Sequence, residues 1–143
     1  MKFWDSSAIV PIVVQEPRSM EIRGFLHQDE GMVVWWGSLL ECYSSLARRL
    51  KEGVFRDLEL NRARMALEGL AEMWSEILPG VRLRQSAERA LFLHSLRAAD
   101  SLQLASALVW VRHQPHRHEF VCLDHRLRDA ARAEGFQVIP ESL

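Results

Sequence analysis

Two short apolar runs of this chain each end in an aspartate that stands directly before a helical pattern. Lys2-Phe3-Trp4 is followed by Asp5, and the run from Glu119 to Leu123 is followed by Asp124. A third run, Met32 to Trp36, is bounded by glycines and also precedes a helical pattern. Short apolar runs that alternate with longer amphipathic segments predict parallel strands joined by right-handed helical crossovers. Both aspartates should then lie at the carboxyl edge of one sheet, where open α/β sheets bind ligands.

Helix should dominate the rest of the chain. Helices are predicted at residues 8–14, 38–52, 57–78, 86–94, 98–112 and 126–133, with further short strands at 81–83 and 136–139. There is no internal repeat, low-complexity tract or linker, and 143 residues with 48% apolar content can form one core. We therefore expect a single domain over residues 1–143. Its fold should be a three-layer α/β/α arrangement with dominant helices and a short-stranded, mainly parallel central sheet.

Composition limits the classes of function. No apolar run approaches the eighteen or so residues that a membrane-spanning helix needs, so a cytoplasmic protein is expected. Cys42 and Cys122 lie in apolar segments without a CxxC spacing, which predicts buried free thiols. The net charge of −1 does not by itself indicate a nucleic-acid-binding protein. All the basic residues except Lys2 and Lys51 are arginines, however, and the guanidinium group suits contact with phosphate.

Four carboxylates are predicted to share one edge of the sheet. Asp5 and Asp124 follow strands, and Glu41 lies in the first turn of the helix that follows a third strand. Asp100 is in line with apolar residues four, seven and eleven positions further along its helix, so its side chain should point inward. Like charges about 5 Å apart repel by roughly 3 kcal/mol per pair at an effective dielectric of 20, so such a group favours a bound cation. Hard, oxygen-ligated Mg²⁺ or Mn²⁺ fits best, and such an ion supports phosphodiester hydrolysis.

Each of these acids also has a purely structural interpretation. Carboxylates at helix N-termini act as caps and dipole partners worth roughly 0.3 to 1 kcal/mol each. Ser38-Leu-Leu-Glu41 has the spacing of a capping box, which would explain Glu41 without any catalytic role. The structural interpretation is weakest for Asp100, because an ionised carboxylate on a buried helical face is costly unless it is paired or binds a metal.

Four segments of the chain resemble the motifs of one known family. Residues 3–10, Phe-Trp-Asp-Ser-Ser-Ala-Ile-Val, are similar to the opening segment of PIN domains, including the VapC-type toxins of bacterial toxin–antitoxin pairs. Residues 38–49 resemble the family's helix that bears an acidic residue, residues 96–105 its third acidic motif, and residues 121–127 its late strand and aspartate. The four segments occur in family order across essentially the whole chain.

The resemblance implies a PIN-like fold and a Mg²⁺- or Mn²⁺-dependent endoribonuclease that is the toxin of a toxin–antitoxin pair. It implies Asp5 and Asp100 as direct metal ligands, and Glu41 and Asp124 as ligands or as residues that position water. It also implies that the hydroxyl of Ser6 supports the site. The expected partners are an RNA substrate, a cognate antitoxin protein and a second copy of the chain in a homodimer.

The chain departs from the family pattern at two positions. Gln103 stands where many relatives have histidine, and Ser6 stands where threonine is commoner. Neither change removes a carboxylate, so the expectation of activity stands. The arginines at 48, 49, 97 and 126 could steer phosphate groups, although solvated surface charge is the alternative role for each.

Other classes of function fit the residues less well. A phosphatase of the haloacid-dehalogenase type needs a second aspartate where Ser7 stands, and the glycine-rich lysine motif of P-loop enzymes is absent. The histidines at 113–118 surround Pro115, which favours a solvated loop over a metal site. The main alternative is a catalytically silent PIN-fold module that acts by binding or scaffolding, through dimerisation and a partner protein.

Overall fold

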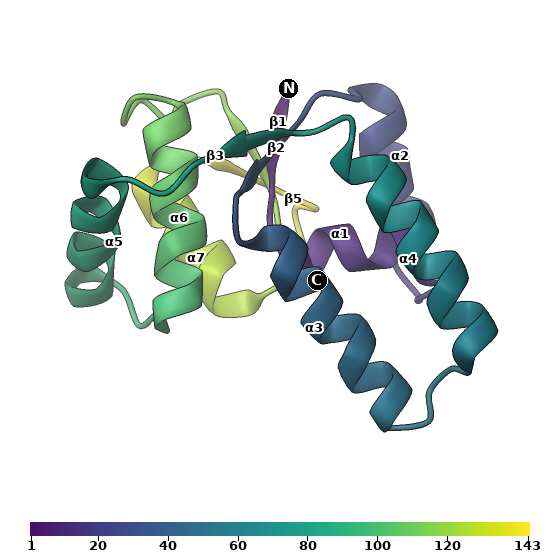
Figure 1. The fold of residues 1–143 in the computed structure, drawn as a ribbon. Helices are drawn as coiled ribbons and strands as arrows, with labels where there is room; N and C mark the ends of the chain where they lie inside the picture. Colours follow the sequence, from purple (N-terminus) through teal and green to yellow (C-terminus); the bar gives the residue numbers. More distant parts are fainter.

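The computed structural model describes all of residues 1–143 and has a five-stranded sheet at its centre (Figure 1). The strands are β1 (Lys2–Trp4), β2 (Met32–Trp35), β3 (Ser75–Ile77), β4 (Glu119–Val121) and β5 (Gln137–Ile139). Their order across the sheet is β3-β2-β1-β4-β5, and all four neighbouring pairs are parallel. β1 therefore lies in the middle, and chain crossovers return to both of its sides.

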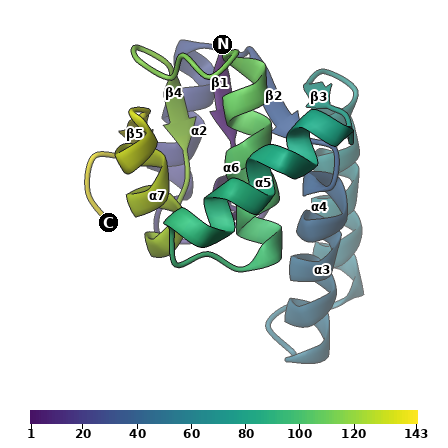
Figure 2. The same ribbon diagram turned by 90° about the vertical axis from the view of Figure 1, so that its left-hand side faces the viewer.

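Seven helices cover the two faces of the sheet. They are α1 (Ser6–Val13), α2 (Ser19–Gln28), α3 (Ser38–Lys51), α4 (Asp57–Ala71), α5 (Val81–Leu93), α6 (Ala98–Trp110) and α7 (His125–Glu134). Helices α5, α6 and α7 pack on one face and α1 to α4 on the other (Figures 1 and 2). The predicted three-layer α/β/α architecture is thus confirmed. No helix is both long and apolar enough to span a membrane.

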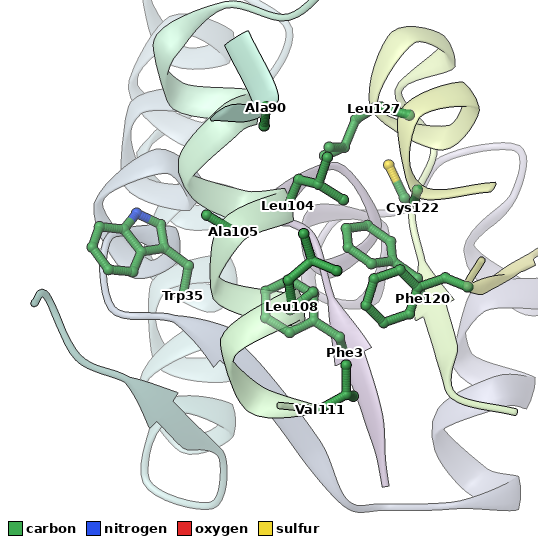
Figure 3. Close-up of a cluster of buried hydrophobic side chains, with 14 of the residues drawn as sticks. Phe3, Trp35, Ala90, Leu104, Ala105, Leu108, Val111, Phe120, Cys122 and Leu127 are labelled. Carbon is green, nitrogen blue, oxygen red and sulfur yellow. The ribbon is translucent and has the colours of Figure 1, made fainter. Parts of the chain in front are cut away.

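Alternate residues of the short strands enter two separate cores. The side chains toward α5, α6 and α7 are Phe3, Val33, Phe120 and Val138, and those toward the other helices are Trp4, Val34 and Val121. Figure 3 shows Leu104 and Leu108 of α6, with Val111 directly after the helix, packed beside Phe3 and Phe120. Because both faces of the sheet are covered, the strands are continuous apolar runs rather than alternating ones.

The segment between α4 and α5 differs from the prediction. The helix expected to continue to residue 78 ends at Ala71, and residues 75–77 form the edge strand β3. The strand expected at residues 81–83 is instead the first turn of α5. Strand β3 has the sequence Ser-Glu-Ile and is partly exposed, so it lacks the apolar run that marks the inner strands. Its position next to β2 is set by the sheet rather than by local pattern.

Helix α2 was not predicted. Its N-terminus at Arg18 has no side-chain cap, Gly24 lies in its middle, and only Ser19 and Ile22 are buried. Weak propensity of this kind is overridden by packing, here of Ile22 in the same core as Trp4 and Ile9. The helix closes one side of that core and positions the loop between α1 and α2.

Gly37 joins β2 to α3 and determines where Glu41 lies. A Cβ atom at this position would clash with the indole nitrogen of Trp35, so the close turn requires glycine. Helix α3 begins at Ser38, directly after this turn of Trp36 and Gly37. This brings Glu41, in its first turn, to the carboxyl edge of the sheet.

Candidate functional site

Asp5 is the most deeply buried of the four predicted acids. It follows β1, caps the N-terminus of α1, and is only 4% exposed. Its carboxylate accepts hydrogen bonds from the Ser7 backbone N–H at 3.0 Å, from the Ser7 hydroxyl, and from the Cys122 thiol at 3.6 Å. No cationic side chain pairs with it. Burial raises the pKa of Asp5 to about 6 against the hydrogen bonds from Ser7, and the negative charge of Glu41 adds to the rise.

Glu41 is held by side chains rather than by the start of its own helix. Its Oε2 atom accepts from the Ser6 hydroxyl at 2.8 Å and from Gln103 Nε2 at 3.0 Å. The predicted capping box is wrong, because Gly37 occupies the cap position and no side chain caps the helix. Ser38 instead accepts a hydrogen bond from Gln103 Nε2 at 2.9 Å. The structural explanation for Glu41 as a cap is therefore removed.

Asp100 and Asp124 do cap helices. Asp124 is exposed, and its Oδ1 atom accepts from the backbone N–H of Leu127 at 2.9 Å at the start of α7. Asp100 accepts from the backbone N–H of Arg97 at 3.4 Å at the start of α6, and it is only partly buried, less than its helical position predicted. Burial, and then the negative charge of Asp124, raise the pKa of Asp100 above its usual range.

The four acids are thus arranged as two pairs at the carboxyl edge of the sheet. We call Asp5 with Glu41 the inner pair and Asp100 with Asp124 the outer pair. Cys122 lies between the pairs, because its thiol is 3.6 Å from Asp5 Oδ2 and 3.6 Å from the backbone carbonyl oxygen of Asp124. No three histidine, cysteine, aspartate or glutamate side chains come close enough together to hold a metal ion. The acids instead influence one another in twos, Glu41 acting on Asp5 and Asp124 on Asp100, rather than forming one four-membered cluster.

The inner pair has the donor chemistry that Mg²⁺ needs. Mg²⁺ retains several waters in proteins and is usually bound by one or two carboxylates together with substrate phosphates, so three protein ligands are not required. Asp5 is a buried carboxylate without a positive partner, and such a group is stabilised by a cation. Asp5 and Glu41 therefore fit a hard divalent cation.

A polar cavity of about 390 Å³ opens beside the inner pair. It is lined by α1, the loop between α1 and α2, α3 and the start of α6, and only Val10 and Ala99 of its lining are apolar. The other lining residues are Ser6, Ser7, Glu16, Glu41, Ser44, Ser45, Arg48 and Arg49. The cavity links the predicted acidic site to two of the arginines that could steer phosphate.

Three supporting residues were given no role in the predicted site. The Ser7 hydroxyl donates to Asp5 and accepts from the backbone N–H of Leu123 at 2.9 Å, so it joins α1 to the end of β4. Gln103 donates to Glu41 from α6, and Ser38 of α3 accepts a hydrogen bond from the same amide group. Gln103 is 1% exposed, and a buried amide on an otherwise apolar helix face was the available signal. Ser7 and Ser38 offered no such signal, because serines near a helix start are usually caps.

Comparisons with known proteins support the fold. No family model and no curated protein matches this sequence. Among solved structures, the crystal structure of FitAcB from Neisseria gonorrhoeae is similar with a TM-score of 0.65 at 14% identity, over 96% of each chain. A toxin–antitoxin complex from Klebsiella pneumoniae is similar with a TM-score of 0.60 at 14% identity, over 87% of each chain. At this identity the likeness shows the fold alone, and it confirms the PIN-like α/β/α class.

Proposed function

We propose that this chain is a Mg²⁺- or Mn²⁺-dependent endoribonuclease and the toxin of a toxin–antitoxin pair. The observation that carries the proposal is the inner pair: a buried, unpaired Asp5 and an oriented Glu41 at the carboxyl edge of a parallel sheet, beside a polar cavity. A fold keeps such a costly arrangement where a cation and a charged substrate make use of it.

The residues of the chain suit hydrolysis of a phosphodiester. Ser6 and Gln103 both bind Oε2 of Glu41, so Oε1 is left free to accept a proton from an attacking water. Asp5 and Glu41 would hold the metal, with Asp100 and Asp124 facing the same edge to position water or the leaving group. The metal, when bound, would polarise the phosphodiester and lower the pKa of water.

The toxin assignment rests on the two solved structures of similar fold, one of which is described as a toxin–antitoxin complex. We propose accordingly that a cognate antitoxin covers the acidic site and that the chain forms a homodimer. Leu91, Phe92 and Leu93 at the end of α5 are exposed, Phe92 by 87%, and such an apolar patch favours a protein interface. Light scattering on the purified chain measures its molar mass. The mass of a monomer at micromolar concentration would contradict the proposed homodimer.

The central test is cleavage of a mixed cellular RNA pool by the purified protein, with Mg²⁺ or Mn²⁺ and with EDTA. The Asp5→Asn protein is the control, because the amide is nearly isosteric and its oxygen can still accept the hydrogen bond from the backbone of Ser7. We expect metal-dependent products that are lost in the variant. If both proteins are inactive with every metal, the catalytically silent binding module replaces this proposal.

A further inference from the structure

One face of α3 carries opposite charges at its two ends. Glu41, Ser44, Ser45 and Arg48 all line the cavity, and their spacing of three, four and seven residues places them along one side of the helix. With a rise of 1.5 Å per residue, the Cα atoms of Glu41 and Arg48 are about 10 Å apart along the axis. The cavity is therefore negative beside the inner pair and positive about two turns further along α3.

The two arginines at the positive end differ in their availability. The guanidinium of Arg49 is partly buried and is bound by Glu16, from the loop between α1 and α2, and by the Ser45 hydroxyl. Its charge is compensated within the protein. Arg48 is exposed, lines the same cavity, and makes no ion pair or side-chain hydrogen bond. The positive end of the cavity thus holds one free guanidinium, with the exposed hydroxyl of Ser44 one turn before it.

We propose that Ser44 and Arg48 form a subsite for a phosphate group of an RNA strand, next along the strand from the bond that is cut. This inference deepens the proposed function and rests on it. A strand whose scissile phosphate lies at the inner pair carries further negative charges at regular intervals, so it satisfies both ends of the cavity at once. The fork of a guanidinium donates two parallel hydrogen bonds to a phosphate, and the serine hydroxyl adds a third donor.

An acidic peptide is a less suitable occupant of this subsite. A carboxylate would also pair with Arg48, but only two of the ten lining residues are apolar, so the cavity offers little surface to hold the side chains beside it. Recognition through charge and hydrogen bonds alone is typical of contacts to a nucleic-acid backbone. The RNA strand is therefore the occupant that the lining favours.

Binding is tested with a fluorescein-labelled pool of random-sequence single-stranded RNA about twelve nucleotides long, a length within the usual range of single-strand sites. Fluorescence anisotropy measures its Kd for the Asp5→Asn protein in Mg²⁺, so that no cleavage intervenes. Arg48→Ala should weaken binding about five-fold and reduce the slope of log K against log salt by about 0.7, the value for one lost phosphate contact on a single strand. Arg48→Lys should keep the slope and lose part of the affinity.

The matched control is Arg82→Ala, which removes one exposed, unpaired arginine from α5, outside the cavity. It should bind RNA as the parent does, and thermal denaturation should show both variants folded. Equal Kd values for the Arg48→Ala and Arg82→Ala proteins would overturn the subsite, as would an absence of RNA binding by the parent. The subsite would also be overturned if the protein bound polyglutamate but not RNA, and if that binding were lost in the Arg48→Ala protein.

The same variants in the otherwise unchanged protein separate this inference from the proposed function. If the protein cleaves RNA and Arg48→Ala cleaves equally well, the subsite fails and the nuclease stands. If no protein cleaves RNA but binding still depends on Arg48, the nuclease fails and the strand-binding subsite stands.

Discussion

The inner and outer pairs of acids lie at the same edge of the sheet but are built in different ways. Side chains from α1, α6 and the end of β4 hold Asp5 and Glu41, and Asp5 also caps α1 through the backbone N–H of Ser7. Asp100 and Asp124 are held by backbone N–H groups at the starts of their own helices. The inner pair therefore depends on tertiary packing, whereas the outer pair depends mainly on where two helices begin.

This difference has an energetic consequence. A cap at a helix start stabilises the fold by about 1 kcal/mol and needs no other partner. A buried carboxylate without a positive partner lowers the stability of the folded chain until a cation binds. The outer pair is therefore compatible with a purely structural role, whereas the inner pair has a net cost that function would explain.

The largest effect should be the difference in cleavage rate between a variant of the inner pair and a variant of the outer pair. Asp5→Asn should lower the rate by about a thousand-fold, because removing a preorganised charged group from a catalytic site costs about 10² to 10³ in rate. Asp124→Asn should cost about ten-fold, since this side chain is exposed and its position is less restricted. The measurement is kcat/KM on an RNA fragment that the wild type cuts. Equal losses at both positions would remove the functional distinction between the pairs.

The second-largest effect is on stability, which the Asp5→Asn change should raise although it lowers the cleavage rate. The folded-state pKa of Asp5 is about 6, above its ordinary value of 3.8, so the folded chain holds this proton more tightly than the unfolded chain. The contribution of Asp5 to stability therefore falls as pH rises from about 4 to about 6, by about 3 kcal/mol in total. Asp5→Asn should be more stable than the wild type at pH 7.5 by up to this amount.

Urea denaturation at pH 4 and pH 7.5 measures this difference. The difference in unfolding free energy between Asp5→Asn and wild type should increase as pH rises. Mg²⁺ should decrease this difference at pH 7.5, because it stabilises the wild type. A gap that stays constant across this range would show that burial of Asp5 is not costly in the folded protein.

The third effect tests how the inner pair is oriented. Gln103→Leu removes the amide that donates to both Glu41 and Ser38. Loss of an orienting partner of this kind should lower the cleavage rate by about ten- to a hundred-fold. Gln103→His retains a ring N–H donor and should recover most of the activity. If the leucine variant has the wild-type rate and the same Mg²⁺ dependence, Gln103 serves packing alone.

The smallest effect belongs to the outer pair. Asp124→Ala removes the N-cap of α7 and should lower the free energy of unfolding by about 1 kcal/mol, whereas Asp124→Asn keeps an acceptor and should change it by less than about 0.5 kcal/mol. Chemical denaturation at pH 7.5 distinguishes the two variants. A loss above about 2 kcal/mol for Asp124→Asn would show that the outer pair also depends on tertiary contacts.

The inner strands, most helices and the positions of the acids could be predicted, because apolar runs that end at Asp5 and Asp124 report strand ends directly. Strand β3 and helix α2 could not, since one is a polar edge strand and the other has no cap and a central glycine. Their structure is set by neighbours that are distant in sequence. The segment around Pro79 was misassigned for the same reason.

The candidate site was predicted unevenly. Residue pattern was enough to place the four acids at strand ends and helix starts. It predicted a capping box at Glu41, which α3 lacks, whereas Asp100, expected to point inward, accepts a capping hydrogen bond at the start of α6. A capping box and a tertiary hydrogen bond from Ser6 need the same residue types at Glu41, so spacing cannot separate them. The donor that settles the matter, Gln103, lies on a helix more than sixty positions away.

Strand β1 has a further consequence for how this protein could be controlled. It is hydrogen-bonded on both edges, to β2 and β4, and it sends Phe3 into one core and Trp4 into the other. A displacement of Asp5 would therefore require both cores to repack together. Occupying the open cavity requires no such repacking, so it would cost a regulator less free energy. Inhibition of this site should accordingly be competitive with substrate, raising the apparent KM while leaving kcat unchanged.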